Sequence, residues 1–175
     1  LTYALTQVDN SGYRIVLFPG VYSEGSTIVV SKLNLDILAV GTETGNTSIS
    51  SIVNVSNASS TVAFEGIAFT NLTVSGAGNC YLKGCRASTS VTKSGSGYFQ
   101  AIDCGFDSSG GTFVTGGGSC VFDGGQQAFL SISNASALVT VKNNISMYQS
   151  SVSSGLLDLQ NAIVYSSTNT ANAVT

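Results

Sequence analysis

The stretch that decides the fold runs from residue 62 to residue 165 and repeats one five-residue pattern six times. The pattern is apolar, any residue, apolar, any residue, turn residue. Its copies are VAFEG (62–66), CYLKG (80–84), FQAID (99–103), CVFDG (120–124), VTVKN (139–143) and LDLQN (157–161). Successive copies are 18 to 21 residues apart. This period is too short for a helical-hairpin repeat and is typical of a solenoid of stacked β-strands.

The positions within the pattern differ in their chemistry. The first and third are apolar in all six copies, although only 43% of the chain is hydrophobic, so both are predicted to point into a core. The fifth is always a residue that tolerates a positive φ angle, which predicts that each strand ends at a corner. The fifth-position residues are Gly66, Gly84, Asp103, Gly124, Asn143 and Asn161.

The fourth position is predicted to lie on the outer surface, because neighbouring residues of a strand face opposite ways. Stacking the copies then places Glu65 beside Lys83 and Asp123 beside Lys142. Exposed pairs of opposite charge contribute only a few tenths of a kcal/mol. Their expected role is to favour one register.

Two more strands are expected in each turn. The second, after the corner, is assigned the apolar residues Ile67, Phe69, Ala87, Phe106, Ile145, Met147, Ile163 and Tyr165. The third is less regular and is assigned Leu72, Val74, Val91, Phe113, Val114, Phe129, Ile132 and Val152.

The residues before the repeat indicate a helix followed by strands. Apolar residues on one side of 1–8 allow two helical turns, and strand-like runs follow at 14–18, 27–30 and 33–40. Beyond a loop at 41–46 the strand pattern resumes with Ile49, Ile52, Val53 and Val55. We predict a single domain, 1–175, with less regular initial coils over 1–60 and regular rungs over 61–175. Its ends lack the atypical capping repeats of a solenoid, so we expect a fragment of a longer chain.

Composition excludes several classes of function. Charged residues make up 9% of the chain, the net charge is −3 and the six basic residues are scattered, which argues against nucleic-acid binding. No apolar run approaches the roughly 20 residues of a membrane-spanning helix. With no histidine and no Cys-x-x-Cys spacing, a zinc site is not expected.

The four cysteines are located by the repeat. Cys85 and Cys104 share one position in neighbouring copies, about 4.8 Å apart if stacked. Cys80 and Cys120 share another position two copies apart. Because other copies carry Ile67 and Phe99 at these positions, buried thiols in a core stack are favoured over disulfides. The redox compartment stays open.

The initial segment carries a resemblance to a known fold. A short helix, a strand leading into FPGVYSE (18–24) and an alternating stretch ending at Val40-Gly41 resemble the first coils of right-handed parallel β-helix proteins. These include pectin methylesterases, pectate-lyase-like domains and above all bacteriophage tailspikes and tail fibres. The resemblance implies an all-β, right-handed parallel β-helix with three strands per turn, usually trimeric around its axis. Its rungs would be short, about 18 to 21 residues.

Members of this fold that cleave polysaccharides need acidic residues grouped on one outer face. The acids of the repeat region are Glu65, Asp103, Asp107, Asp123 and Asp158. Asp103 and Asp107 are interpreted as turn residues, which leaves Asp107 with Asp123 as the one conceivable pair. The esterase motifs, a Gln-Asp pair followed by an aspartate-aromatic motif and an arginine, have no match. No catalytic, cofactor-binding or metal residue is therefore assigned.

Other candidate features have ordinary structural explanations. The glycosylation sequons at Asn46, Asn54, Asn57, Asn71, Asn134 and Asn144 are expected from composition alone. The run Gly116-Gly117-Gly118 lacks a following lysine and helix, so it is interpreted as a wide corner. Exposed tyrosines could contact a glycan, although packing is the commoner role. The candidates are Tyr81, Tyr98, Tyr148 and Tyr165.

These observations and the resemblance lead to three hypotheses. The first is a non-enzymatic structural protein on the surface of a virion, such as a tail fibre, a tailspike shaft or a capsid-surface fibre, that contributes to host attachment. Its expected partners are two further copies of the chain, other virion proteins and a host surface glycan. The second is a β-helix polysaccharide depolymerase, a lyase or hydrolase. The third is a bacterial surface adhesin module.

Overall fold

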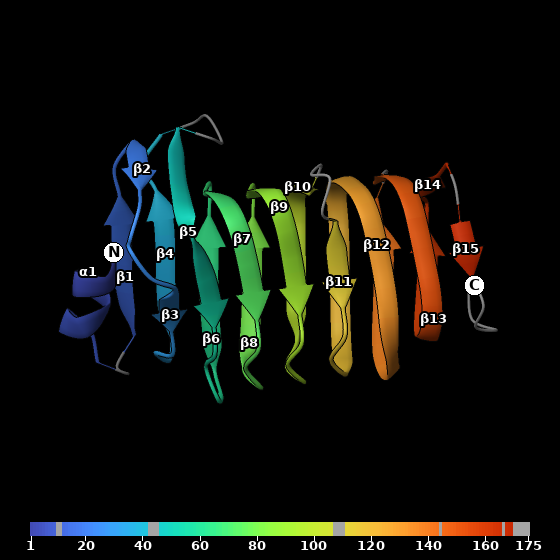
Figure 1. Ribbon diagram of the computed structural model, residues 1–175, viewed down its shortest axis with the longest axis horizontal. Helices are drawn as coiled ribbons and strands as arrows, with labels where there is room; N and C mark the ends of the chain where they lie inside the picture. Colours follow the sequence, from blue (N-terminus) through green and yellow to red (C-terminus); the bar gives the residue numbers. More distant parts are fainter. Residues whose placement is uncertain (10–11, 42–45, 107–110, 144, 166, 170–175) are drawn as a thin grey trace.

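The computed structural model describes residues 1–9, 12–41, 46–106, 111–143, 145–165 and 167–169 and shows a parallel β-helix (Figure 1). The chain makes about seven turns of about 20 residues. In Figure 1 the nearer strands run downward and the farther strands upward while the chain advances from left to right, so the coil is right-handed. The predicted all-β solenoid with a short initial helix is confirmed.

The described elements are one helix and fifteen strands. They are α1 (Thr2–Gln7), β1 (Tyr13–Leu17), β2 (Gly20–Tyr22), β3 (Ile28–Val30), β4 (Leu35–Ala39), β5 (Thr47–Val55), β6 (Thr61–Glu65), β7 (Ala68–Val74), β8 (Asn79–Lys83), β9 (Arg86–Lys93), β10 (Phe99–Phe106), β11 (Thr112–Val114), β12 (Gly118–Lys142), β13 (Ser146–Gln160), β14 (Ile163–Val164) and β15 (Ser167–Asn169). Several strands bend around a corner and so contribute to two faces of the coil.

The repeated pattern forms the first face, which we call face A. It consists of β1, β4, β6 and β8, residues 99–102, 120–123, 139–142 and 157–160. Val62 pairs with Cys80 and Phe64 with Leu82, as the repeat predicts. All first and third positions are buried except Leu159, which is partly buried. Two continuous apolar columns therefore run along the inside of this face.

Each strand of the pattern ends at the predicted left-handed corner. The φ angles of the six fifth-position residues are +71° at Gly66, +56° at Gly84, +50° at Asp103, +72° at Gly124, +60° at Asn143 and +52° at Asn161. A side chain with a β-carbon is strained in this region, and asparagine and aspartate tolerate it best. The residue types at this position follow from the corner geometry.

Faces B and C complete each turn. Face B holds β2, residues 47–49, 68–69, 86–87, 104–106, 125–127 and 146–147, and β14. Face C holds β3, residues 53–55, 71–74, 90–93, β11, residues 130–132 and 150–152, and β15. The assignment of the apolar residues to a second and third strand is largely correct.

Three apolar residues in or next to these strands point outward instead of into the core. Strand β5 buries every second residue from Thr47 to Val55, so Ile52 lies between the inward Ser51 and Val53 and points outward, where it is 47% exposed. Met147 pairs with Val164, so Ile163 and Tyr165 on either side of Val164 point outward. In each case one residue of offset moves a side chain to the opposite face of the strand.

Two phenylalanines assigned to the third strand also point outward. Thr112 pairs with Leu130, and both are buried, which turns Phe113 and Phe129 outward. Their rings pack together on the outer surface with centroids 5.9 Å apart.

The segments that lead from face C to the next face A are rich in glycine, and we call residues 75–78, 94–98 and 115–118 the glycine corner. A β-carbon at Gly95 would lie 1.9 Å from the carbonyl oxygen of Gly76, and one at Gly97 would lie 1.9 Å from that of Gly78. Since no real β-carbon approaches an oxygen so closely, consecutive turns can stack here only through glycine. Gly116-Gly117-Gly118 belongs to this corner, as predicted.

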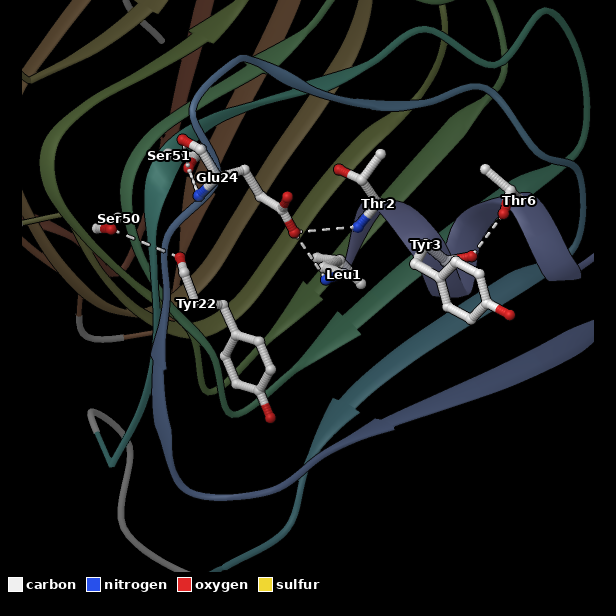
Figure 2. A network of polar contacts seen from close by, with 8 residues as sticks. All are labelled: Leu1, Thr2, Tyr3, Thr6, Tyr22, Glu24, Ser50 and Ser51. Carbon is white, nitrogen blue, oxygen red and sulfur yellow. Dashed lines mark hydrogen bonds and ion pairs between the residues drawn. The ribbon is translucent and has the colours of Figure 1, made fainter.

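Helix α1 covers the first turn through an interaction with Glu24 (Figure 2). The Glu24 carboxylate accepts hydrogen bonds from the amino nitrogen of Leu1 at 2.8 Å and from the backbone N–H of Thr2 at 3.2 Å. The Glu24 N–H donates to the Ser51 hydroxyl at 2.6 Å, and that hydroxyl donates to the Glu24 carbonyl at 2.9 Å. Leu5 is buried against the core, so the predicted amphipathic helix is confirmed.

Candidate functional site: the outer surface of face A

Charged side chains pair across neighbouring turns on the outside of face A. Lys83 Nζ lies 2.8 Å from Glu65 Oε1, and Lys142 Nζ lies 3.2 Å from Asp123 Oδ2, which confirms both predicted pairs. A third pair, Arg14 with Asp36 at 3.2 Å, joins β1 to β4. The signal that could have identified it is the second position of the pattern, extended into the initial coils.

These contacts change the acidity of the paired groups. The hydrogen bond that the Lys83 ammonium donates to the Glu65 carboxylate raises the pKa of Lys83. A hydrogen bond from the Asn143 side chain and the nearby Lys142 ammonium lower the pKa of Asp123. Lys83 and Asp123 are therefore stabilised in their ionised forms, which makes each a poor general acid or base near neutral pH.

The other acidic candidates are not assembled into a catalytic pair among the described residues. Asp103 occupies its corner with positive φ, in agreement with the turn interpretation. Asp158 accepts a hydrogen bond from Gln160 at 2.6 Å. Asp107 lies outside the described residues, so the structure does not test the hypothetical pair of Asp107 with Asp123.

All four cysteines are buried and free. Cys85 and Cys104 lie in adjacent turns as predicted, and the Cys85 N–H donates to the Cys104 sulfur at 3.4 Å. A hydrogen bond with Cys104 lowers the pKa of Cys85 and, in turn, raises that of Cys104. Burial raises the pKa of Cys120 to about 11 and also raises that of Cys80. These thiols belong to the core columns.

Lys93 is a buried lysine that the sequence pattern did not identify. Its side chain points inward from face C between Val74 and Val114 and is 1% exposed. The ammonium donates hydrogen bonds to the carbonyls of Gly95, at 2.6 Å, and Gly117. Burial lowers the pKa of Lys93. The available signal was its third-strand position, which in the turns before and after carries valine.

The four candidate tyrosines form two pairs. Tyr81 and Tyr98 are tilted by 51° with ring centroids 5.7 Å apart, and Tyr148 and Tyr165 are stacked at 5.4 Å. In the stacked pair each ring covers one face of the other, which favours a packing role. Tyr81 differs because it also lines a hollow on the outside of face A.

That hollow, which we call the Ala63 notch, has a volume of about 250 Å³. Asp36, Ala63 and Tyr81 follow one another in the second position of successive strands, so the small alanine stands between two larger side chains. The Arg14–Asp36 and Glu65–Lys83 pairs also line it, together with Leu38 and Ile102. Among the features described so far, this hollow brings together the most groups able to contact a ligand.

The described sequon asparagines are engaged in structural contacts. Asn57 is fully buried, and its amide donates to the Ser60 carbonyl at 3.1 Å. Asn54 and Asn71 accept hydrogen bonds from serines of the next turn, and Asn134 donates to Thr115. Asn46 also makes a polar or electrostatic contact. Asn144 lies outside the described residues.

The described part of the chain holds no group of three or more Cys, Asp or Glu residues placed to bind a metal ion. Its one helix is too short to cross a membrane. A scan against protein-family models, a search of curated proteins and a search of solved structures each found no match. Function is therefore inferred from the fold and from the residues of this chain.

Proposed function

We propose that the protein is a non-enzymatic structural component of a virion surface, a tail fibre, tailspike shaft or capsid-surface fibre that contributes to host attachment. The observation that carries this proposal is the use of the outward acidic side chains of face A. Asp36, Glu65 and Asp123 each form an ion pair with the neighbouring turn, and Asp158 is held by Gln160. The three ion pairs join neighbouring turns and so favour one register of the coil.

The shape of the molecule supports the same proposal. The strands of successive turns stack along one axis, as Figure 1 shows, and each turn is hydrogen-bonded to the turns beside it. Ladders of this kind make a stiff rod with few irregular backbone segments among the described residues. A stiff rod suits a projection that holds a contact surface away from a particle.

The proposed assembly is a homotrimer with its three coils side by side, attached to other virion proteins. Sedimentation of the purified full chain would give the mass of three copies if this is correct. A monomer at all concentrations would contradict the trimer and leave the structural role to be tested by location.

Location is the decisive test. Immunogold microscopy of purified particles, with an antibody against this chain, is expected to label a projection on the particle surface. Protein that is secreted free of particles and that releases oligosaccharides from a bacterial surface polysaccharide would overturn the proposal in favour of a depolymerase. Protein anchored to a bacterial envelope without particles would instead favour an adhesin.

A further inference from the structure

The Ala63 notch is a gap of one side chain in the outer column of face A. Asp36, Ala63 and Tyr81 occupy the same position in three successive strands. Parallel strands are about 4.8 Å apart, so the side chains of Asp36 and Tyr81 are about 10 Å apart across the alanine. A flat ring placed above the Ala63 methyl group would take the position of the missing side chain.

The lower part of the notch is apolar. Leu38 lines it from the strand before Ala63, Ile102 lines it from the strand after Tyr81, and the Tyr81 ring provides one wall. Tyr98 packs against Tyr81 at 5.7 Å from the next turn, which helps to hold the ring in place. Rings stack on aromatic side chains at separations close to the strand spacing. The apolar face of a sugar ring fits such a surface.

The rim of the notch carries balanced charge. Arg14 with Asp36 and Lys83 with Glu65 supply two cations and two carboxylates, at 3.2 Å and 2.8 Å within the pairs. About half or more of each side chain is exposed, so free lone pairs and N–H groups remain available to a ligand. Neighbouring donors and acceptors without net charge match vicinal hydroxyl groups, whereas an anionic ligand would meet two carboxylates.

We propose that the Ala63 notch binds one pyranose unit of a neutral glycan. The ring lies over Ala63 against Tyr81, and its hydroxyls form hydrogen bonds with the two ion pairs at the rim. The inference rests on the proposed role in host attachment and specifies the contact. One site this shallow binds a single sugar only weakly, with a dissociation constant of roughly 1 mM, and several copies on one particle would raise the avidity.

Saturation-transfer NMR on the purified full chain tests the proposal. The probes are methyl glycosides of glucose, galactose and mannose, together with methyl glucuronide as an anionic comparison. We expect transfer to the ring protons of at least one neutral glycoside, and loss of that transfer in Ala63→Leu, which fills the notch. The matched control is Thr140→Leu, the same position of the pattern in a turn beyond the notch, which should retain the wild-type signal.

Three outcomes would overturn the proposal: no transfer to any neutral glycoside, transfer that survives in Ala63→Leu, or transfer to the glucuronide alone. Unchanged thermal unfolding of Ala63→Leu is required, and Tyr81→Ala provides a second variant that should weaken the signal at least several-fold. The sugar-binding proposal and the proposed function can be contradicted independently. A lack of sugar binding would not contradict a location on particles, and absence from particles would not contradict sugar binding.

Discussion

The ammonium group of Lys93 lies 2.6 Å from the carbonyl oxygen of Gly95 in the interior of the coil, where the turns on either side place valine. A buried charge of this kind is tolerated because its donors are satisfied by backbone carbonyls. The glycine corner supplies those carbonyls close to the axis. Lys93 and the corner therefore stabilise one another.

Lys93→Glu is expected to destabilise the protein by about 3 kcal/mol or more, because a carboxylate would face carbonyl oxygens with no donor. Lys93→Met should change the free energy of unfolding by less than about 1 kcal/mol at pH 7. The substitution removes the cost of burying a charge, and the loss of the hydrogen bonds offsets that gain. Denaturant unfolding of both variants measures this. Equal stability of the two variants would contradict the hydrogen-bonded ammonium.

The pH dependence of Lys93 has a definite sign. Burial lowers its pKa in the folded protein, so the folded state loses this proton at lower pH than the unfolded chain, whose lysines titrate at about 10.4. The unfolded state binds more protons within that window, and stability rises with pH there. This pH-dependent contribution to stability should vanish in Lys93→Met. If the difference in unfolding free energy between wild type and variant stays constant from pH 7 to pH 10, the lowered pKa of Lys93 is contradicted.

Gly97→Ala should destabilise the protein by about 3 kcal/mol or more, because the new methyl group would overlap the Gly78 carbonyl of the previous turn. Gly25→Ala is the matched control: no atom lies within 4 Å of its β-carbon position, and its φ angle is outside the left-handed region. Chemical denaturation of the two variants gives the comparison. Similar midpoints would show that the corner relaxes easily.

Asp103 provides a test of the corner interpretation against a chemical role. Asp103→Asn should keep the stability within about 0.5 kcal/mol, because asparagine tolerates positive φ. Asp103→Ala should lose about 1 kcal/mol in the same assay. If both substitutions cost the same, the carboxylate itself contributes, and the turn explanation fails.

Asp123 should make the protein slightly acid-sensitive. Its pKa is lowered in the folded state by Asn143 and Lys142, so its contribution is present above the unfolded value of about 3.9 and is lost as the pH falls through the folded value. The pair is partly exposed, which limits the effect to a few tenths of a kcal/mol. Unfolding of Asp123→Asn between pH 2 and pH 7 should show a correspondingly flatter profile. A steeper profile for Asp123→Asn would contradict the lowered pKa of Asp123 in the folded state.

The four buried cysteines should not react with a thiol reagent until the protein unfolds. Burial raises the pKa of Cys80 and of Cys120, so little thiolate forms at neutral pH even where reagent enters. Colorimetric titration should find no rapidly reacting thiol in the native protein and four in denaturant. One or more fast thiols in the native state would contradict the core packing.

The regular rungs could be predicted because each of their positions has a local physical requirement. Val62 and Phe64 must be apolar to fill the core, and Gly66 must tolerate positive φ. Glu65 and Lys83 are outward by alternation alone. Sequence reasoning succeeds where the side chain itself satisfies the requirement of its position.

The remaining features depend on interactions between turns. The outward packing of Phe113 and Phe129 follows from the pairing of Thr112 with Leu130 in the next turn. Lys93 looks like a surface residue until the carbonyls of Gly95 and Gly117 are located around it. The Ala63 notch likewise depends on which side chains stand before and after it in the stack.

The glycine corner limits how the length of this protein can vary. Repeat proteins commonly gain or lose whole units, because each unit contacts only its neighbours. Here Gly76, Gly95 and Gly116 must follow one another without a β-carbon, and Lys93 requires the corner of its own turn and of the next. These turns are not interchangeable copies but a block with a set order. Natural variants of different length should differ by turns added or removed outside it.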